Sequence, residues 1–143
     1  MEAYIHTVQY YETDKMGITH HSNYIRMMEE ARLAFLESIG WPYAKMEEEG
    51  VISPVVAVEC RYLATTTYPD KIRIQVRIRE FKGVRLKIAY TMYKEDGTKA
   101  AEASSEHCFL DAEGRPIRMK KVYPELYRLL TGLAEADHRE AEK

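Results

Sequence analysis

The chain has 143 residues, 45% of them hydrophobic and 31% charged, which is typical of a globular protein and excludes a disordered one. Its formal net charge of −2 gives no electrostatic basis for binding nucleic acid or an anionic membrane surface. A chain of this length fits one domain, so we expect a single domain over residues 1–143. No apolar run approaches membrane-spanning length and no signal-peptide pattern is present, so we expect the protein in the cytoplasm.

The first predicted element is a strand over residues 4–12, because this segment is rich in Tyr, Ile, Val and Thr. After a turn, a helix begins behind a cap at Ser22 or Asn23 and runs to about Ile39, before a Gly-Trp-Pro stop signal. Its apolar residues cover more than one face, so we expect other structure to enclose this helix. Residues 42–49 are predicted to form a short second helix.

After Gly50 the hydrophobic period changes to two. A strand is predicted over residues 51–62, broken only by Pro54. Over residues 72–79, Ile and Val alternate with Arg and Gln, which gives one apolar and one solvated face. A turn at Lys82-Gly83 leads to another alternating strand over residues 86–92, and Asp96-Gly97 is a strong hairpin signal. A last strand follows over residues 98–110, and a terminal helix over residues 124–136. The sequence therefore predicts an α+β fold, an antiparallel sheet curled around one long helix.

The segment YYETDKMGITHHSNYIRMMEEARLAFLESIG resembles the signature of the 4-hydroxybenzoyl-CoA thioesterase-like family of hotdog-fold acyl-CoA thioesterases. It is most similar to the branch of short-chain acyl-CoA hydrolases found with the Tol-Pal system. The family pattern is a Thr-Asp pair, a glycine, His-x-Asn-Tyr at the start of the helix and Glu-x-Ala-Arg within it. In this chain these motifs are Thr13-Asp14, Gly17, His21–Tyr24 and Glu29–Arg32.

The resemblance continues through Arg61-Tyr62 and the turn at residues 111–115, so it covers most of the chain. It implies a hotdog fold, which agrees with the predicted order of elements. The chain departs from the branch at His20, where Tyr or Phe is usual, and at residues 83–86, where the branch has Gly-Arg-Ser-Ser. The first departure alters the wall of the pocket, and the second affects the contacts to coenzyme A.

The resemblance implies that Asp14 is the catalyst, either as a general base or as a nucleophile that forms a mixed anhydride. A loop aspartate can also simply stabilise a turn. By the same resemblance, a backbone N–H at about His21 holds the oxyanion, since the start of a helix carries about half a positive charge. Gly17 can serve as a plain turn glycine, let the backbone approach the substrate closely, or do both.

Two residues of the helix start have open roles. Asn23 either orients Asp14 or a water, or caps the helix, and Tyr24 belongs to the core, the acyl pocket or both. Glu29 is expected to be a solvated helix residue. The pair His20-His21 does not indicate a metal site, because adjacent residues seldom point at one ion and no third ligand lies at the right spacing. We expect neither a metal nor a cofactor.

Coenzyme A carries several phosphate charges, so cations should border the site. The family places such residues where this chain has Lys82 and Arg85, and Arg118, Lys120 and Lys121 form a second basic cluster. Each of these residues alone can be a solvated surface charge. Cys60 and Cys108 lie in strand-like segments without metal-ligand spacing, and we interpret them as reduced core residues.

The predicted function is hydrolysis of an acyl-CoA thioester to a free acid and coenzyme A. Two alternatives remain: a hotdog acyl-CoA dehydratase or hydratase, in which a loop histidine transfers the proton, and a non-catalytic acyl-CoA-binding module. The sites of hotdog proteins lie between subunits, and a single sheet exposes an edge, so we expect a homodimer or a homotetramer. No nucleic-acid partner and no membrane insertion are expected.

Overall fold

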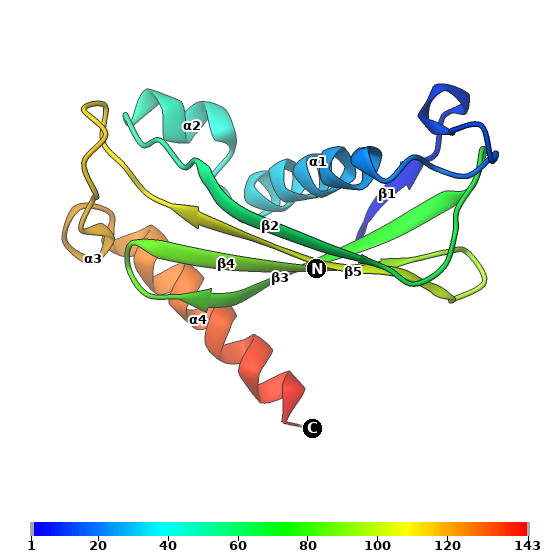
Figure 1. Ribbon diagram of the computed structural model, residues 1–143. Coiled ribbons are helices and arrows are strands. Elements are labelled where there is room, and N and C mark those ends of the chain that lie inside the picture. The colour runs from blue at the N-terminus through cyan, green and yellow to red at the C-terminus, as the bar shows by residue number, and fades with distance from the viewer. Residues whose placement is uncertain (1, 143) are drawn as a thin grey trace. The chain divides into compact units, whose positions relative to one another are not determined.

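The computed structural model describes residues 2–142, which form an α+β fold with one sheet (Figure 1). The strand, the long helix, the run of strands and the terminal helix follow in the predicted order. The elements are β1 (Tyr4–Thr7), the 3-10 helix η1 (Tyr10–Glu12), α1 (Ser22–Ser38), α2 (Tyr43–Glu48), β2 (Val55–Tyr62), β3 (Lys71–Phe81), β4 (Arg85–Tyr93), β5 (Lys99–Cys108), α3 (Met119–Val122) and α4 (Pro124–Ala141).

The predicted strand over residues 4–12 is wrong in its second half. β1 ends at Thr7, and Tyr10–Glu12 form η1. The physical reason is the buried carboxylate of Glu12, whose Oε1 accepts the backbone N–H of Gln9 at 2.7 Å. This bond closes a capping box that bends the chain away from the sheet.

The sheet has five strands in the order β1-β3-β4-β5-β2. β1 pairs antiparallel with β3, with Tyr4 opposite Ile74. Tight turns link β3 to β4 and β4 to β5, as predicted. In these turns Gly83 and Gly97 have φ values of +83° and +88°, a conformation that side chains other than glycine rarely adopt.

β2 is an edge strand of this sheet. It is shorter than the predicted strand over residues 51–62, because it begins only after Pro54, which has no backbone N–H to give to a ladder. Every residue of β2 is exposed except Cys60, which is half-buried. The large apolar side chains in this strand are 50% exposed at Val55, 44% at Val56, 44% at Val58 and 49% at Tyr62.

The chain divides into two compact units. The first comprises Met1–Phe35, Glu59–Val76 and Tyr90–Ala103. The second comprises Leu36–Val58, Arg77–Ala89 and Ser104–Lys143. Strands β2 to β5 each contribute residues to both units. Cys60 lies in the first unit and Cys108 in the second, and both are free.

In the first unit, α1 runs along the sheet (Figure 1). Its buried apolar residues follow helical spacing: Tyr24, Met27, Met28, Ala31 and Phe35. Other structure covers this face of the helix, as predicted, but not the whole helix, because Ile25 is 46% exposed. Of the other large apolar residues of α1, Ile25 and Leu33 are exposed.

In the second unit, α4 begins at Pro124 as predicted and continues to Ala141, beyond the predicted end at residue 136. Its apolar stripe is buried at Leu126, Leu130 and Ala134. The ring of Phe81 packs edge-on against Phe109 at 5.9 Å and tilted against Tyr127 of α4 at 5.6 Å. Among the described residues, no helix is long and apolar enough to cross a membrane.

Candidate active site

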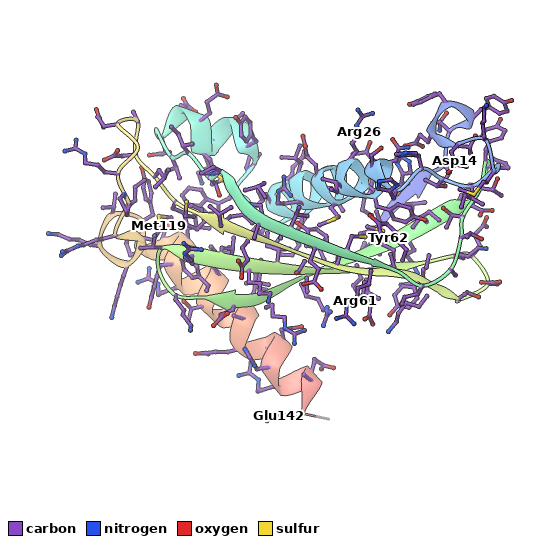
Figure 2. The ribbon with its side chains drawn as sticks, in the orientation of Figure 1. Asp14, Arg26, Arg61, Tyr62, Met119 and Glu142 are labelled. Atoms are coloured by element: carbon purple, nitrogen blue, oxygen red, sulfur yellow. The ribbon has the colours of Figure 1, made fainter. Side chains whose placement is uncertain are left out.

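Asp14 lies in a tight turn between η1 and α1 (Figure 2). The N–H of Gly17 donates to the Asp14 carbonyl at 2.9 Å, and the Asp14 N–H donates to the Ile18 carbonyl at 2.9 Å. The carboxylate oxygen Oδ1 accepts the N–H of Met16 at 2.8 Å, which is the turn role expected of a loop aspartate. Oδ2 has no hydrogen-bond partner within residues 2–142, so one carboxylate oxygen remains available for chemistry.

The two ends of this turn are joined by backbone contacts. Thr13 and Thr19 form an antiparallel bridge. One residue further out on each side, the N–H of His20 donates to the Glu12 carbonyl at 2.8 Å. The N–H of Thr19 donates to the carbonyl of Thr66, in the segment after β2, at 2.8 Å. The turn is therefore fixed both to η1 and to the β2–β3 connection.

Gly17 has a φ of +79°, and a Cβ built on it meets nothing within 4 Å. The conformation, rather than crowding in the chain, requires glycine here. The carbonyl of Gly17 accepts the hydroxyl of Thr67 at 2.6 Å. The structure thus gives Gly17 the turn role, and its predicted approach to substrate stays a prediction.

The backbone N–H groups at the start of α1 are satisfied with one exception. The N–H of Ser22 donates to Nδ1 of His20 at 3.2 Å. The N–H of Asn23 donates to the His20 carbonyl at 3.0 Å, and that of Tyr24 to the His21 carbonyl at 3.2 Å. The N–H of His21 has no partner in the part of the chain that the structure describes. It is an unpaired donor at the start of a helix, where the peptide dipoles favour negative charge.

The predicted cap at Ser22 or Asn23 is wrong, because α1 begins at Ser22 and the His20 ring takes the Ser22 N–H. Asn23 is buried, and its Nδ2 donates to the carbonyl of Glu12 at 2.9 Å. It therefore neither caps the helix nor bonds to Asp14. Its amide connects the first turn of α1 to η1.

Tyr24 is a core residue with a 3% exposed side chain. Its hydroxyl lies 2.9 Å from Oγ1 of Thr66, which lies 2.6 Å from Oγ1 of Thr19. Burial raises the pKa of the Tyr24 hydroxyl, which stays protonated and able to donate. This buried chain of hydroxyls holds the start of α1 to the segments on both sides of it.

Tyr62, at the end of β2, contacts the start of α1 (Figure 2), and the sequence did not predict this contact. Its hydroxyl donates to the carbonyl of His21 at 3.3 Å, and its ring lies edge-on to His21 at 6.3 Å. It also packs edge-on against Tyr24 at 5.1 Å. The family resemblance includes Tyr62 in the pair Arg61-Tyr62, but nothing in the local pattern of β2 indicates a contact with His21.

The remaining polar residues of α1 and its start do not converge on an ion. The rings of His20 and His21 stack at 4.3 Å with an interplanar angle of 29°. Glu29 is exposed, in agreement with the expected solvated residue. Within residues 2–142, no group of three potential metal ligands lies close enough together to hold a metal ion.

The basic residues Lys82 and Arg85 lie in the second unit, whereas the Asp14 turn and the start of α1 lie in the first. Both line a shallow hollow together with Glu80, Leu86, Lys87 and Glu106. Lys82 already pairs with Glu80 at 2.9 Å, and this pair raises the pKa of Lys82 and lowers that of Glu80. Arg85 forms no ion pair among the described residues.

The second basic cluster, Arg118, Lys120 and Lys121, is exposed at and just before α3. Lys120 lies over the ring of Tyr127 at 5.9 Å. None of the three residues lines the hollow that contains Arg85. The structure therefore brings Lys82 and Arg85 together and leaves the second cluster separate from them.

Comparison with known proteins places the chain among thioesterases. The model of the Thioesterase-like superfamily matches residues 8–131. The Bacillus subtilis protein named "Putative acyl-CoA thioesterase YneP" is 34% identical over 119 residues, which cover 82% of this chain and 86% of that protein. The matched family is broader than the Tol-Pal-associated branch, so the branch stays a prediction.

Solved structures give the same result for the fold. The DHNA-CoA thioesterase from Staphylococcus aureus superposes with a TM-score of 0.88 at 29% identity, covering 98% of this chain and 94% of that one. A hypothetical protein from Aquifex aeolicus superposes with a TM-score of 0.81 at 35% identity, covering 89% of this chain and 97% of that one.

Proposed function

The chain belongs to the Thioesterase-like superfamily and has the hotdog fold predicted from its sequence, and from this premise we propose that it hydrolyses an acyl-CoA thioester. The observation that carries the proposal is the presence of two chemically useful groups at nearby positions in the sequence. One is the unpaired N–H of His21 at the start of α1, and the other is the Asp14 carboxylate in the turn before it. Thioester hydrolysis needs a donor for the oxyanion and a base or nucleophile, and these groups supply both.

In the proposed reaction, the thioester carbonyl oxygen accepts the His21 N–H. Asp14 removes a proton from water as the water oxygen attacks the carbonyl carbon, and the negative charge moves to the carbonyl oxygen. When the tetrahedral intermediate collapses, the carbon–sulfur bond breaks and the proton passes to the coenzyme A sulfur. The products are the free acid and coenzyme A, with Asp14 restored as a carboxylate.

Asp14 can also attack the carbonyl carbon directly, which releases coenzyme A and forms a mixed anhydride that water then hydrolyses. A reaction in water enriched in oxygen-18 tests this route. Label found in the side chain of Asp14 after turnover would assign it as the nucleophile. With Asp14 as a base, all of the label appears in the product acid.

The acyl group is proposed to lie beside Tyr62, next to the start of α1, with Tyr24 behind it in the core. The Staphylococcus relative is named for DHNA-CoA, so the first panel should set aromatic acyl-CoA thioesters against short aliphatic ones, with release of free thiol as the readout. Thiol release with at least one acyl group is expected. Binding of every thioester without thiol release would replace the proposal with a binding module. Loss of the enoyl absorbance of crotonyl-CoA without thiol release would indicate a hydratase.

We also propose that the active form is a homodimer, joined at β2. A long, exposed, apolar edge strand is prone to pair with another chain, and β2 has these properties. Tyr62, the residue that touches the His21 carbonyl, is in the same strand. Light scattering at the assay concentration should therefore find at least a dimer, and a stable, active monomer would contradict this part of the proposal.

A further inference from the structure

Two carboxylates of the first unit flank His6, which the proposed chemistry does not use. Its Nε2 lies 2.9 Å from Oε1 of Glu12, and its Nδ1 lies 2.8 Å from Oε2 of Glu30. The side chain of His6 is 11% exposed and that of Glu12 is 6% exposed, whereas Glu30 is 44% exposed. The Tyr4 hydroxyl donates to the same oxygen of Glu30 at 3.2 Å. The His6 ring therefore lies within hydrogen-bonding distance of one buried carboxylate, that of Glu12, and of one exposed carboxylate, that of Glu30.

The Glu12 side chain has two polar contacts. Its Oε1 lies 2.9 Å from Nε2 of His6 in β1 and accepts the backbone N–H of Gln9 at 2.7 Å. The buried carboxylate therefore links β1 to the residue just before η1, and removing it would leave both contacts unmade.

The main chain of Glu12 holds the start of α1. Its carbonyl accepts the N–H of His20 at 2.8 Å and Nδ2 of Asn23 at 2.9 Å. The Asp14 turn leaves the chain two residues after Glu12, and the unpaired N–H of His21 belongs to the peptide that follows His20. Glu12 is therefore bonded through its side chain to Gln9 and through its carbonyl to His20 and Asn23. These contacts lie directly before the Asp14 turn and on either side of the His21 N–H.

We propose that Glu12 and His6 are positioning residues for this site: the buried contact between them fixes the Glu12 peptide, and this peptide sets the His21 N–H relative to the Asp14 turn. The inference rests on the proposed function. A rotation of the Glu12 peptide moves the turn and the start of the helix relative to each other, and a misplacement of about 1 Å costs about a hundredfold in rate. Neither residue touches the substrate in this proposal.

The test compares Glu12→Ala and His6→Ala with the control Glu30→Gln, which changes the other carboxylate on the same histidine. Glu12→Ala should lower kcat by about 10- to 100-fold and change KM by less than about threefold, because positioning acts on the transition state. His6→Ala should have a smaller effect in the same direction. The double variant should be no slower than Glu12→Ala alone, because both changes break one contact. Glu30→Gln should stay within about twofold of the wild type in kcat, since it has no bond to the start of α1.

A second readout is independent of activity. Amide hydrogen exchange in Glu12→Ala should show lost protection at His20, whose N–H bonds to the Glu12 carbonyl, and unchanged protection at Met28 within α1. If Glu12→Ala does not fold, Glu12→Gln, which keeps the size and one acceptor oxygen, should show the same loss at His20 with a decrease in kcat of about three- to tenfold. A general loss of structure would lower protection at both amides.

The inference is overturned if a folded Glu12 variant keeps the wild-type kcat, if Glu30→Gln is as slow as Glu12→Ala, or if protection at His20 is unchanged. Wild-type protein that hydrolyses no thioester would contradict the proposed function. The exchange result at His20 would still stand on its own in that case, so the two failures are distinguishable.

Discussion

The turn that leads into α1 and the edge strand β2 both carry residues of the candidate site, but the single chain completes them to different degrees. In the turn, the chain itself supplies backbone acceptors for the N–H groups of Asp14, Gly17, Thr19 and His20, whereas the His21 N–H has no partner among the described residues. In β2, the large apolar side chains stay about half exposed, at 50% for Val55 and 44% for Val58.

This difference separates what the chain builds alone from what we expect a second copy to complete. The turn is already hydrogen-bonded within the chain, and a donor and carboxylate held in this way are useful for catalysis because they need little reorganisation when charge develops. The edge strand has buried little apolar surface, so it gains stability by pairing. Changes in the turn should therefore affect chemistry, and changes in β2 should affect assembly.

The largest expected effect is that of Asp14→Asn. The change keeps an oxygen for the Met16 N–H but removes the base and the nucleophile, so kcat should fall by ~10²–10⁴. Substrate binding should stay near the wild-type value, and the free energy of unfolding should change by only about 0.5 kcal/mol. These three quantities should be measured on the same preparation. Near-normal turnover in the folded variant would exclude Asp14 as the catalyst and direct attention to Glu29 and the His21 side chain.

The assembly half of the comparison is tested by Val58→Lys in β2. A lysine on each copy brings like charges together across the proposed interface, and the dimer dissociation constant should rise on the order of 100-fold. Gln75→Lys is the matched control, because Gln75 is also exposed but lies in β3, an interior strand of the sheet. Analytical ultracentrifugation over a dilution series gives both constants. Equal effects from the two lysines would move the interface away from β2.

The next effect concerns the contacts to the coenzyme A phosphates that the family resemblance predicts for Lys82 and Arg85. Arg85→Ala should raise KM for an acyl-CoA by about three- to tenfold with little change in kcat, and added salt should mimic it. Lys82→Ala should do less, because Lys82 is already paired with Glu80. Arg79→Ala, at an exposed arginine of the same unit, serves as the control. An unchanged KM in the Lys82→Ala/Arg85→Ala double variant would transfer the role to the cluster formed by Arg118, Lys120 and Lys121.

The smallest effect sharpens the account of the turn itself. Tyr24→Phe removes one end of the buried hydroxyl chain through Thr66 and should lower the free energy of unfolding by about 1 kcal/mol. Because burial raises the pKa of Tyr24 above 10.0, its neutral form is favoured in the fold, and this contribution is present below pH 10 and lost as the pH rises through the folded pKa. Denaturant melts should therefore show the gap to the wild type narrowing above about pH 10. Tyr43→Phe, at a tyrosine that is 63% exposed, should show neither effect.

Much of the fold could be predicted because its signals are local. The alternation of Ile72, Ile74 and Ile78 with Arg and Gln residues gives β3 its buried face, and all three isoleucines are in the core. Lys82-Gly83 and Asp96-Gly97 form the predicted turns, since only glycine adopts the required positive φ readily. The turn around Asp14 and Gly17 and the helix that follows it could also be predicted, because turns and helix starts favour few residue types.

The limits of β1 and the cap of α1 were predicted wrongly for the opposite reason. Strand propensity continues through Tyr10 and Tyr11, but the buried Glu12 carboxylate binds the Gln9 N–H and turns the chain into η1. A glutamate in a sequence gives no sign that it is buried. In the same way, Asn23 has the composition of a cap, but its amide reaches the Glu12 carbonyl instead.

The sequence by itself determined the order of elements, the turns and the family, because propensity, periodicity and short motifs depend on neighbouring residues. Only the tertiary structure decided which polar groups meet. Tyr62 reaches the His21 carbonyl from 41 residues away, and Thr66 joins Tyr24 from 42 residues away. Such contacts depend on how the end of β2 and the segment after it lie against the start of α1, and no local pattern encodes that placement. That the His21 N–H has no partner within residues 2–142 could likewise be found only from the folded chain, in which the N–H groups of His20 and Asn23 both have acceptors.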